Sequence, residues 1–145
     1  MDAMRKRIIL IGVVIIAIIL LYPHLSKKYV YKEAEQLVDE YFNKSIDGDY
    51  EGVADLFRKE NALVMPWDDF VMRIKYSNTH LGEIQNWTLL DINSIEASED
   101  LNIIYLTYKV ERPEYPSKES FIIYHNLNED SLKIYGYDIV SEGFR

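Results

Sequence analysis

The residues of this chain that could serve acid–base chemistry inside a folded domain are His125, Asp138 and Asp91. In strands, residues two positions apart point to the same face. His125 is in phase with Phe121, and Asp138 is in phase with Ile134, so the pattern predicts that both face the core. A buried imidazole or carboxylate has a shifted pKa and can act as a general acid or base. We interpret these three residues as weak candidates for a pocket.

A direct dyad of His125 and Asp138 is not expected. If Asn128 pairs with Ser131 across a short hairpin, the two side chains are four residues apart along it, about 13 Å. A one-residue bulge at Gly136 would not close that gap. The spacing favours polar residues that are satisfied or exposed, so catalysis by either residue is not expected, and the chain is interpreted more readily as a non-enzyme than as an enzyme.

Metal and cofactor chemistry has little support in the sequence. His24 and His80 stand alone, with no second histidine at ligand spacing. Asp47, Asp49 and Glu51 alternate, but helix stop and cap positions explain them better than a calcium loop. The chain has no cysteine, which excludes thiolate sites and disulfides. We therefore expect no metal and no cofactor.

Aromatic residues are a stronger signal, because the chain has twelve tyrosines and many fall in strand-like runs. Tyrosine favours strands and tolerates exposure, which is one explanation. Both faces of the predicted sheet carry apolar residues, however, whereas a sheet with one wet face usually alternates with polar ones. Tyrosine is also enriched at protein interfaces. The predicted interface consists of Tyr105, Tyr108, Tyr124, Tyr135 and Tyr137.

The elements that must position these residues begin with helices. Spacing of 3.6 residues predicts three of them: from Val30 to a stop at Gly48, from an Asp49 cap to Phe57, and from Pro66 to Gly82. A brief strand is expected at 61–65.

Period-two patterns then predict an antiparallel meander. Its four strands are Ile84–Ile95, Leu101–Glu111, Ser120–Leu127 and Leu132–Val140. Helices first and strands afterwards indicate an α+β fold, with three helices packed on a curved four- to five-stranded antiparallel sheet.

The N-terminus predicts a membrane anchor. Residues 1–7, including Arg5, Lys6 and Arg7, form a basic tail, and residues 8–25 are almost wholly apolar. We expect Ile8–Leu25 to be a single transmembrane helix, with the N-terminus in the cytoplasm and residues 26–145 outside. A cleaved signal peptide is the alternative, but no small-x-small pair follows the apolar run. Pro23 predicts a break or a kink at the join to the next helix.

Charge narrows the choice of partners. The first 25 residues carry three cations and one acid, and the whole chain has a net charge of −8, so residues 26–145 carry −10. Such a domain repels nucleic-acid phosphates. It would suit a basic protein partner.

Three segments resemble the cystatin-like cone of the nuclear-transport-factor-two-like superfamily. Ser45–Tyr50 followed by Val53–Phe57 is similar to that family's join between its first two helices. Leu81–Ile84 resembles its helix-to-sheet corner, and Lys133–Tyr137 its final strand. The resemblance implies a conical cavity between helices and sheet, and dimers through the sheet face. It also implies a superfamily divided between enzymes and binding modules.

These features favour a membrane-anchored, non-catalytic protein-interaction or scaffold domain at a bacterial cell envelope. The expected partner is another protein or a second copy of the chain. Two alternatives remain open: a cone that binds a small molecule or acts as an isomerase or lyase, and an acidic inhibitor or immunity-type partner of a basic protein.

Overall fold

The computed structural model describes the backbone of residues 2–59, 66–129 and 131–144. The side chains of residues 2–12, 18, 19, 21–26 and 67 are not described within those ranges. The chain divides into two compact units, Met1–Lys32 and Glu33–Arg145, and the first is helical. Within the part of the chain that the structure describes, no helix combines the length and apolarity needed to cross a bilayer. Most side chains of the expected anchor, residues 8–25, lie outside the described ones.

Helix α1 (Asp2–Asp47) runs through the boundary of the two units. Of the break or kink predicted at Pro23, the break is wrong, because helical backbone continues through that residue. Proline removes one N–H···O=C bond, and a helix can continue past that loss. The predicted stop is confirmed, since α1 ends at Asp47 and Gly48 takes φ +73°.

The two other helices form where their end signals predict. Helix α2 (Tyr50–Asp55) begins after Asp49, whose Oδ1 accepts a hydrogen bond from Gly52 N at 2.9 Å. Helix α3 (Trp67–Leu81) follows Pro66 and ends at Gly82. The brief strand expected at 61–65 lies outside the described residues.

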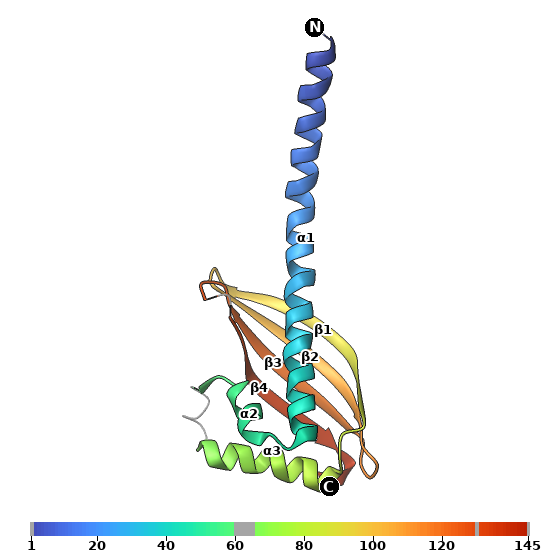
Figure 1. The fold of residues 1–145 in the computed structure, drawn as a ribbon, viewed down its shortest axis with the longest axis vertical. Helices are drawn as coiled ribbons and strands as arrows, with labels where there is room; N and C mark the ends of the chain where they lie inside the picture. Colours follow the sequence, from blue (N-terminus) through green and yellow to red (C-terminus); the bar gives the residue numbers. More distant parts are fainter. Residues whose placement is uncertain (1, 60–65, 130, 145) are drawn as a thin grey trace. The chain divides into compact units, whose positions relative to one another are not determined.

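The fold class is confirmed as α+β, with four antiparallel strands in one sheet of order β1-β2-β3-β4 (Figure 1). The short 3₁₀ helix η2 (Glu142–Phe144) follows the last strand. The strands are β1 (Asn86–Ser98), β2 (Leu101–Glu111), β3 (Ser117–Asn126) and β4 (Ser131–Ser141).

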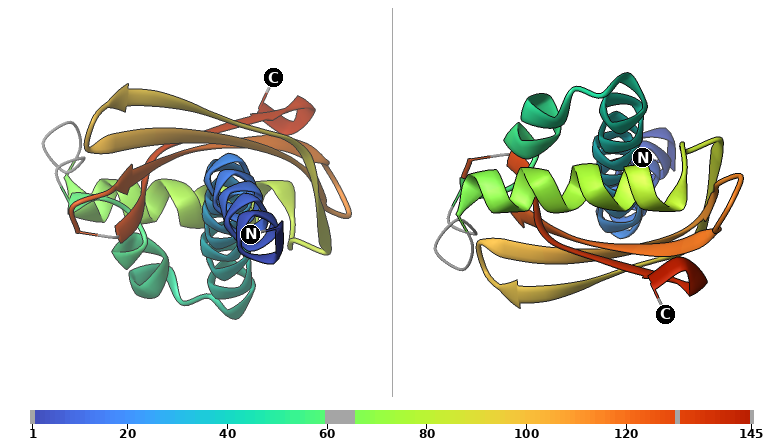
Figure 2. Two further views of the ribbon diagram at one scale, coloured as in Figure 1. Left: turned by 90° about the horizontal axis from the view of Figure 1, so that it is seen from above. Right: turned by 90° about the horizontal axis from the view of Figure 1, so that it is seen from below.

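Within the second unit, helices gather on one face of the sheet, as the two end-on views show (Figure 2). We call that face the inner face and the opposite one the outer face. Inner residues of β2 and β3 alternate with outer ones: Ile104 and Phe121, for example, have no exposed surface. From α1, Tyr41 and Phe42 pack edge-on against Phe121, at ring-centroid distances of 5.0 and 5.6 Å. Interlocked aromatic rings therefore fill the space between α1 and the sheet.

The β3–β4 hairpin has a register different from the expected one. Asn126, not Asn128, pairs with Ser131, because the Asn126 side chain accepts a hydrogen bond from Asn128 N and starts the turn two residues earlier. An irregularity between Ile122 and Ile123 lies opposite Gly136 and adds one residue to β4.

Candidate functional site

A buried ion pair lies at the end of the sheet where β2 turns into β3. Arg112 follows β2 directly, and Glu119 is the third residue of β3. Arg112 Nη2 lies 2.8 Å from Glu119 Oε1, and neither side chain has any exposed surface. Charges are almost never fully buried unless they are paired. This pair is therefore the most unusual polar feature of the described residues.

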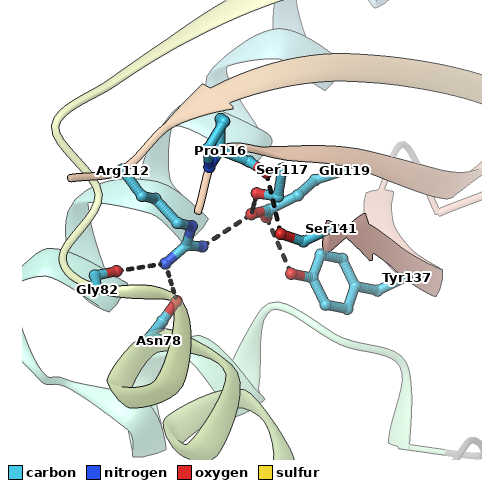
Figure 3. A network of polar contacts seen from close by, with 8 residues as sticks. All are labelled: Asn78, Gly82, Arg112, Pro116, Ser117, Glu119, Tyr137 and Ser141. Atoms are coloured by element: carbon cyan, nitrogen blue, oxygen red, sulfur yellow. Dashed lines mark hydrogen bonds and ion pairs between the residues drawn. The ribbon is translucent and has the colours of Figure 1, made fainter. Parts of the chain in front are cut away.

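The arginine ties helix α3 to the sheet (Figure 3). Its Nη1 donates to Asn78 Oδ1 at 3.1 Å and to the Gly82 carbonyl oxygen at 2.8 Å. Gly82 caps α3 with φ 86° and ψ 168°, a conformation that favours glycine. The last turn of α3 therefore presents two acceptors to one guanidinium group, which holds the helix end against the β2–β3 connection.

The glutamate is held by three donors. Besides Arg112, Ser117 Oγ donates to Oε1 at 2.8 Å and Tyr137 Oη donates to Oε2 at 2.9 Å (Figure 3). Both oxygens of this carboxylate therefore have a donor within hydrogen-bond distance. The carboxylate of Glu119 thus has a structural role, and it is poorly placed to act as a base toward a substrate.

Two tyrosines adjoin the pair from opposite sides of the core. Tyr41 on α1 and Tyr137 on β4 have ring centroids 5.4 Å apart. Burial raises the pKa of both hydroxyls far above the ordinary value, and the charge of Glu119 adds to the effect. The Tyr41 hydroxyl lies near those of Tyr137 and Ser45, but among the described residues it has hydrogen-bond geometry with neither. Both phenols stay neutral at physiological pH.

A hollow of about 330 Å³ adjoins this network. Ser45 and Asn78 line it, together with Gly82 and residues of α2 and α3. Ser45 Oγ and Asn78 Nδ2 are buried and have no hydrogen-bond partner among the described residues. A small polar molecule is the kind of ligand that this wall could bind.

The three pocket candidates are not brought together. His125 is on the inner face, 4% exposed, and is six residues from Glu119 along β3, roughly 20 Å. Asp91 is exposed on the outer face of β1, and Asp138 is exposed on the edge strand β4, where it lines a hollow of about 410 Å³ beside α3. The inward orientation predicted for Asp138 is wrong, because the extra residue beside Gly136 reverses the phase of the strand.

The five tyrosines of the predicted interface divide between the two faces. Tyr108 is 3% exposed on the inner face, and Tyr137 also points inward to Glu119. Tyr105, Tyr124 and Tyr135 are on the outer face, where Tyr124 and Tyr135 stack with centroids 4.0 Å apart and planes 4° apart. Only these three are placed to meet a partner.

The three outer tyrosines belong to a larger apolar patch. Register pairs Ile95 with Ile103 and Ile103 with Tyr124, and the neighbouring row pairs Tyr105 with Ile122. Members that are 36% exposed or more include Ile95, Tyr105 and Tyr135. We define the outer patch as Ile95, Ile103, Tyr105, Ile122, Tyr124 and Tyr135.

Sequence reasoning did not identify Arg112 and Glu119. One signal was present: Glu119 is in phase with Phe121 and Ile123, so a charged residue occupies an inward position of a buried strand. Such a residue needs a partner of opposite charge, and Arg112 lies across the predicted turn.

Comparisons with protein-family models, curated proteins and solved structures found no match to this chain.

Proposed function

We propose that this protein is a membrane-anchored, non-catalytic interaction domain that binds another protein at the cell envelope through the outer face of its sheet. The outer patch is the observation that carries the proposal. Soluble domains seldom leave contiguous aromatic and aliphatic side chains exposed across several strands without use. Tyrosine in such a patch supplies large contact area at low entropic cost.

The packing of the inner face supports a non-catalytic role. Tyr41, Phe42 and Phe121 are fully buried against one another, so the domain's own side chains occupy the space that a substrate would need in a cone. Arg112 and Glu119, which are fully buried charged side chains of the described residues, are bonded to each other. The proposed scaffold for this contact surface is the cystatin-like cone that the sequence resembles, with three helices on a curved sheet.

The anchor is the second part of the proposal. Residues 8–25 would tether the domain beside the bilayer, with residues 1–7 in the cytoplasm and residues 26–145 outside. Protease added to intact cells should digest the domain and leave a small membrane-bound fragment. A mature chain that begins near residue 26, or a domain that the protease cannot reach, would overturn the anchor or its orientation.

Photo-crosslinking in native membranes tests the contact surface. A photoreactive residue at position 105 should give a discrete crosslinked product. The same residue in place of Met72, which is 67% exposed on α3, should not. Tyr135→Lys should abolish the product from position 105 while the domain stays folded. Equal products from both positions, or a product that Tyr135→Lys does not affect, would contradict the proposal.

A small-molecule role is the second candidate, and the hollow beside Ser45 and Asn78 is the observation that favours it. Ligand-detected NMR with a library of small polar molecules tests it, because a true ligand would lose binding in Asn78→Leu. The inhibitor hypothesis rests on the net charge of −10, and it requires partner binding that weakens steeply with salt.

A further inference from the structure

Strand β1 forms one edge of the sheet and is exposed along its whole length. The strand order places β2 on one side of it and, among the described residues, no strand on the other. None of its 13 residues is buried, whereas β2, β3 and β4 each contain buried residues. An edge strand presents a row of backbone N–H and C=O groups with which another strand can form hydrogen bonds.

The opposite edge of the sheet is partly covered by the chain itself. Phe57 forms a parallel bridge with Ile134 on β4, and Arg58 N donates to Ile134 O at 2.9 Å. Other edge strands are protected by lysine or proline within the strand. Strand β1 contains neither residue type. In the part of the chain that the structure describes, β1 is therefore the edge that is open to a partner.

The middle of β1 is regular enough to receive a second strand. Irregularities lie after Leu89 and after Glu96. Between them, the six residues 91–96 pair in continuous register with residues 102–107 of β2. Six residues are about the length of an average strand. Because a bulge bends an edge away from its neighbours, pairing is expected in the stretch between the two irregularities.

The apolar side chains of this stretch are only partly covered. Ile92 points to the inner face opposite Leu106, but it is half-buried, whereas Leu106 has no exposed surface. Ile95 points to the outer face, is 51% exposed and belongs to the outer patch. A strand added beside β1 would cover both isoleucines with its own side chains. It would also extend the contact that the outer patch makes.

The charge of this edge favours a basic segment. Residues 86–100, from the start of β1 to the turn that follows it, contain four acids and no lysine, arginine or histidine. Asp91, Glu96, Glu99 and Asp100 are these acids, and none of them has an ion pair among the described residues. A second copy of the chain would bring the same acids to the pairing, so like charges oppose self-association here. Lysine or arginine on the added strand would be complementary.

We propose that an extended segment of the protein partner adds to β1 as a further strand, with one basic residue opposite Asp91 and another opposite Glu96. Aliphatic residues of the segment lie opposite Ile92 and Ile95. The segment therefore has the pattern basic, aliphatic, two residues of any type, aliphatic, basic, which is the same in both strand directions. This inference rests on the proposed function and adds the conformation and the chemistry of the bound segment.

Peptide binding to the full chain in nonionic detergent micelles tests the inference, with fluorescence anisotropy as the measurement. The probe is a ten-residue peptide with Lys-Ile-Thr-Thr-Ile-Lys at its centre. Its first control has glutamate in place of both lysines and should bind at least about tenfold more weakly, because like charges then face each other. Equal affinity of these two peptides would overturn the proposed basic pattern.

Two N-methylated copies of the probe separate strand addition from simple attraction. Neighbouring residues of a strand direct their N–H groups to opposite edges. Methylation of two alternate amides should weaken binding at least about tenfold where these amides face β1, and less than about twofold where they face away. Equal affinities of the two copies would overturn the inference, because charge and apolar contact do not distinguish them.

Two double variants with the same change of charge locate the site. Asp91→Asn/Glu96→Gln should weaken binding of the lysine peptide about fivefold. Asp138→Asn/Glu114→Gln removes two exposed acids that lie outside β1, and it should weaken binding less than about twofold. Equal effects of the two double variants would mean long-range attraction to an acidic domain and would overturn the inference.

The remaining outcomes separate this inference from the proposed function. Amide hydrogen exchange should slow within residues 91–96 when the lysine peptide binds. Protection confined to β2 and β3, or no binding by any peptide at about 1 mM, would overturn strand addition but keep the outer patch as a contact surface. A dimer in sedimentation that the peptide dissociates would assign the edge to a second copy and would also overturn the inference. The crosslinking result at position 105 is independent of these outcomes.

Discussion

Arg112 and Glu119 form a fully buried ion pair seven residues apart in the chain, with Nη2 and Oε1 separated by 2.8 Å. The pair joins the start of β3 to the end of α3, because Arg112 also bonds to Asn78 and to the Gly82 carbonyl oxygen. Loss of one partner would leave the other charge buried without compensation.

The first prediction concerns this pair. Arg112→Met should lower the free energy of unfolding by about 3–5 kcal/mol, because Glu119 would stay buried without its counter-charge. The double variant Arg112→Met/Glu119→Gln should recover part of that loss, since glutamine is neutral, its amide oxygen still accepts from one of the two hydroxyls, and its NH₂ group can donate to the oxygen of the other. Urea denaturation measures both. Single and double effects that simply add would contradict the coupling.

The second prediction concerns alkaline pH. Burial raises the pKa of Tyr41, Tyr108 and Tyr137 above the ordinary value. Their neutral hydroxyls therefore contribute stability that is complete below the unfolded-state pKa of about 10 and is lost as pH rises through the folded-state values. We expect the thermal midpoint to fall above pH about 10.

The absorbance of tyrosinate checks this prediction. Exposed tyrosines should titrate first, and a later step should coincide with loss of the far-ultraviolet circular dichroism signal. Tyr108→Phe should reduce the size of the later step. Titration of all tyrosines in one step, with the fold intact, would show that these rings are accessible.

The third prediction compares two glycines with positive φ. Gly82 has φ 86°, and a Cβ there would lie 3.3 Å from Pro113 Cδ. Gly48 has φ 73°, and a Cβ would meet nothing within 4 Å. Gly48→Ala should cost about 1 kcal/mol for backbone strain alone. Gly82→Ala should cost more, about 1–3 kcal/mol plus any shift of the Arg112 acceptor. Denaturant midpoints decide the order, and equal costs would contradict it.

The fourth prediction concerns the cap of α2 at acid pH. The Gly52 N–H first, and Lys44 second, hold the pKa of the Asp49 carboxyl below its usual range. Because its pKa is lowered in the folded state, the ionised carboxyl stabilises the fold at pH values above the unfolded-state pKa of about 3.9. This stabilisation is lost as pH falls through the folded-state pKa. At neutral pH the thermal midpoint should therefore decrease from wild type to Asp49→Asn to Asp49→Ala.

Thermal melts from pH 7 to the acid range check that order. The gap between wild type and Asp49→Asn should close as the carboxyl becomes protonated, at pH values below about 4. A gap that stays constant over this range would show that the charge of Asp49 makes no contribution.

Local signals in the sequence determined the elements of this protein. These signals act on the backbone conformation of a few neighbouring residues: Gly48, Gly82, the Asp49 cap and the period-two runs. The helix ends and β2 appear where the signals predict. The order of helices and strands then led to the α+β class. Composition likewise determined the acidic charge of the domain.

Tertiary structure decided which side chains meet. One extra residue beside Gly136 turned Asp138 outward, and a turn that starts at Asn126 shifted the hairpin by two residues. Register has a period of two, so such small shifts move a residue to the opposite face. Strand alternation puts Tyr105 and Tyr108 on opposite faces of β2, but it does not show which of the two faces the helices cover. The buried pair of Arg112 and Glu119 needed α3 as well, because its acceptors come from a helix end some thirty residues earlier in the chain.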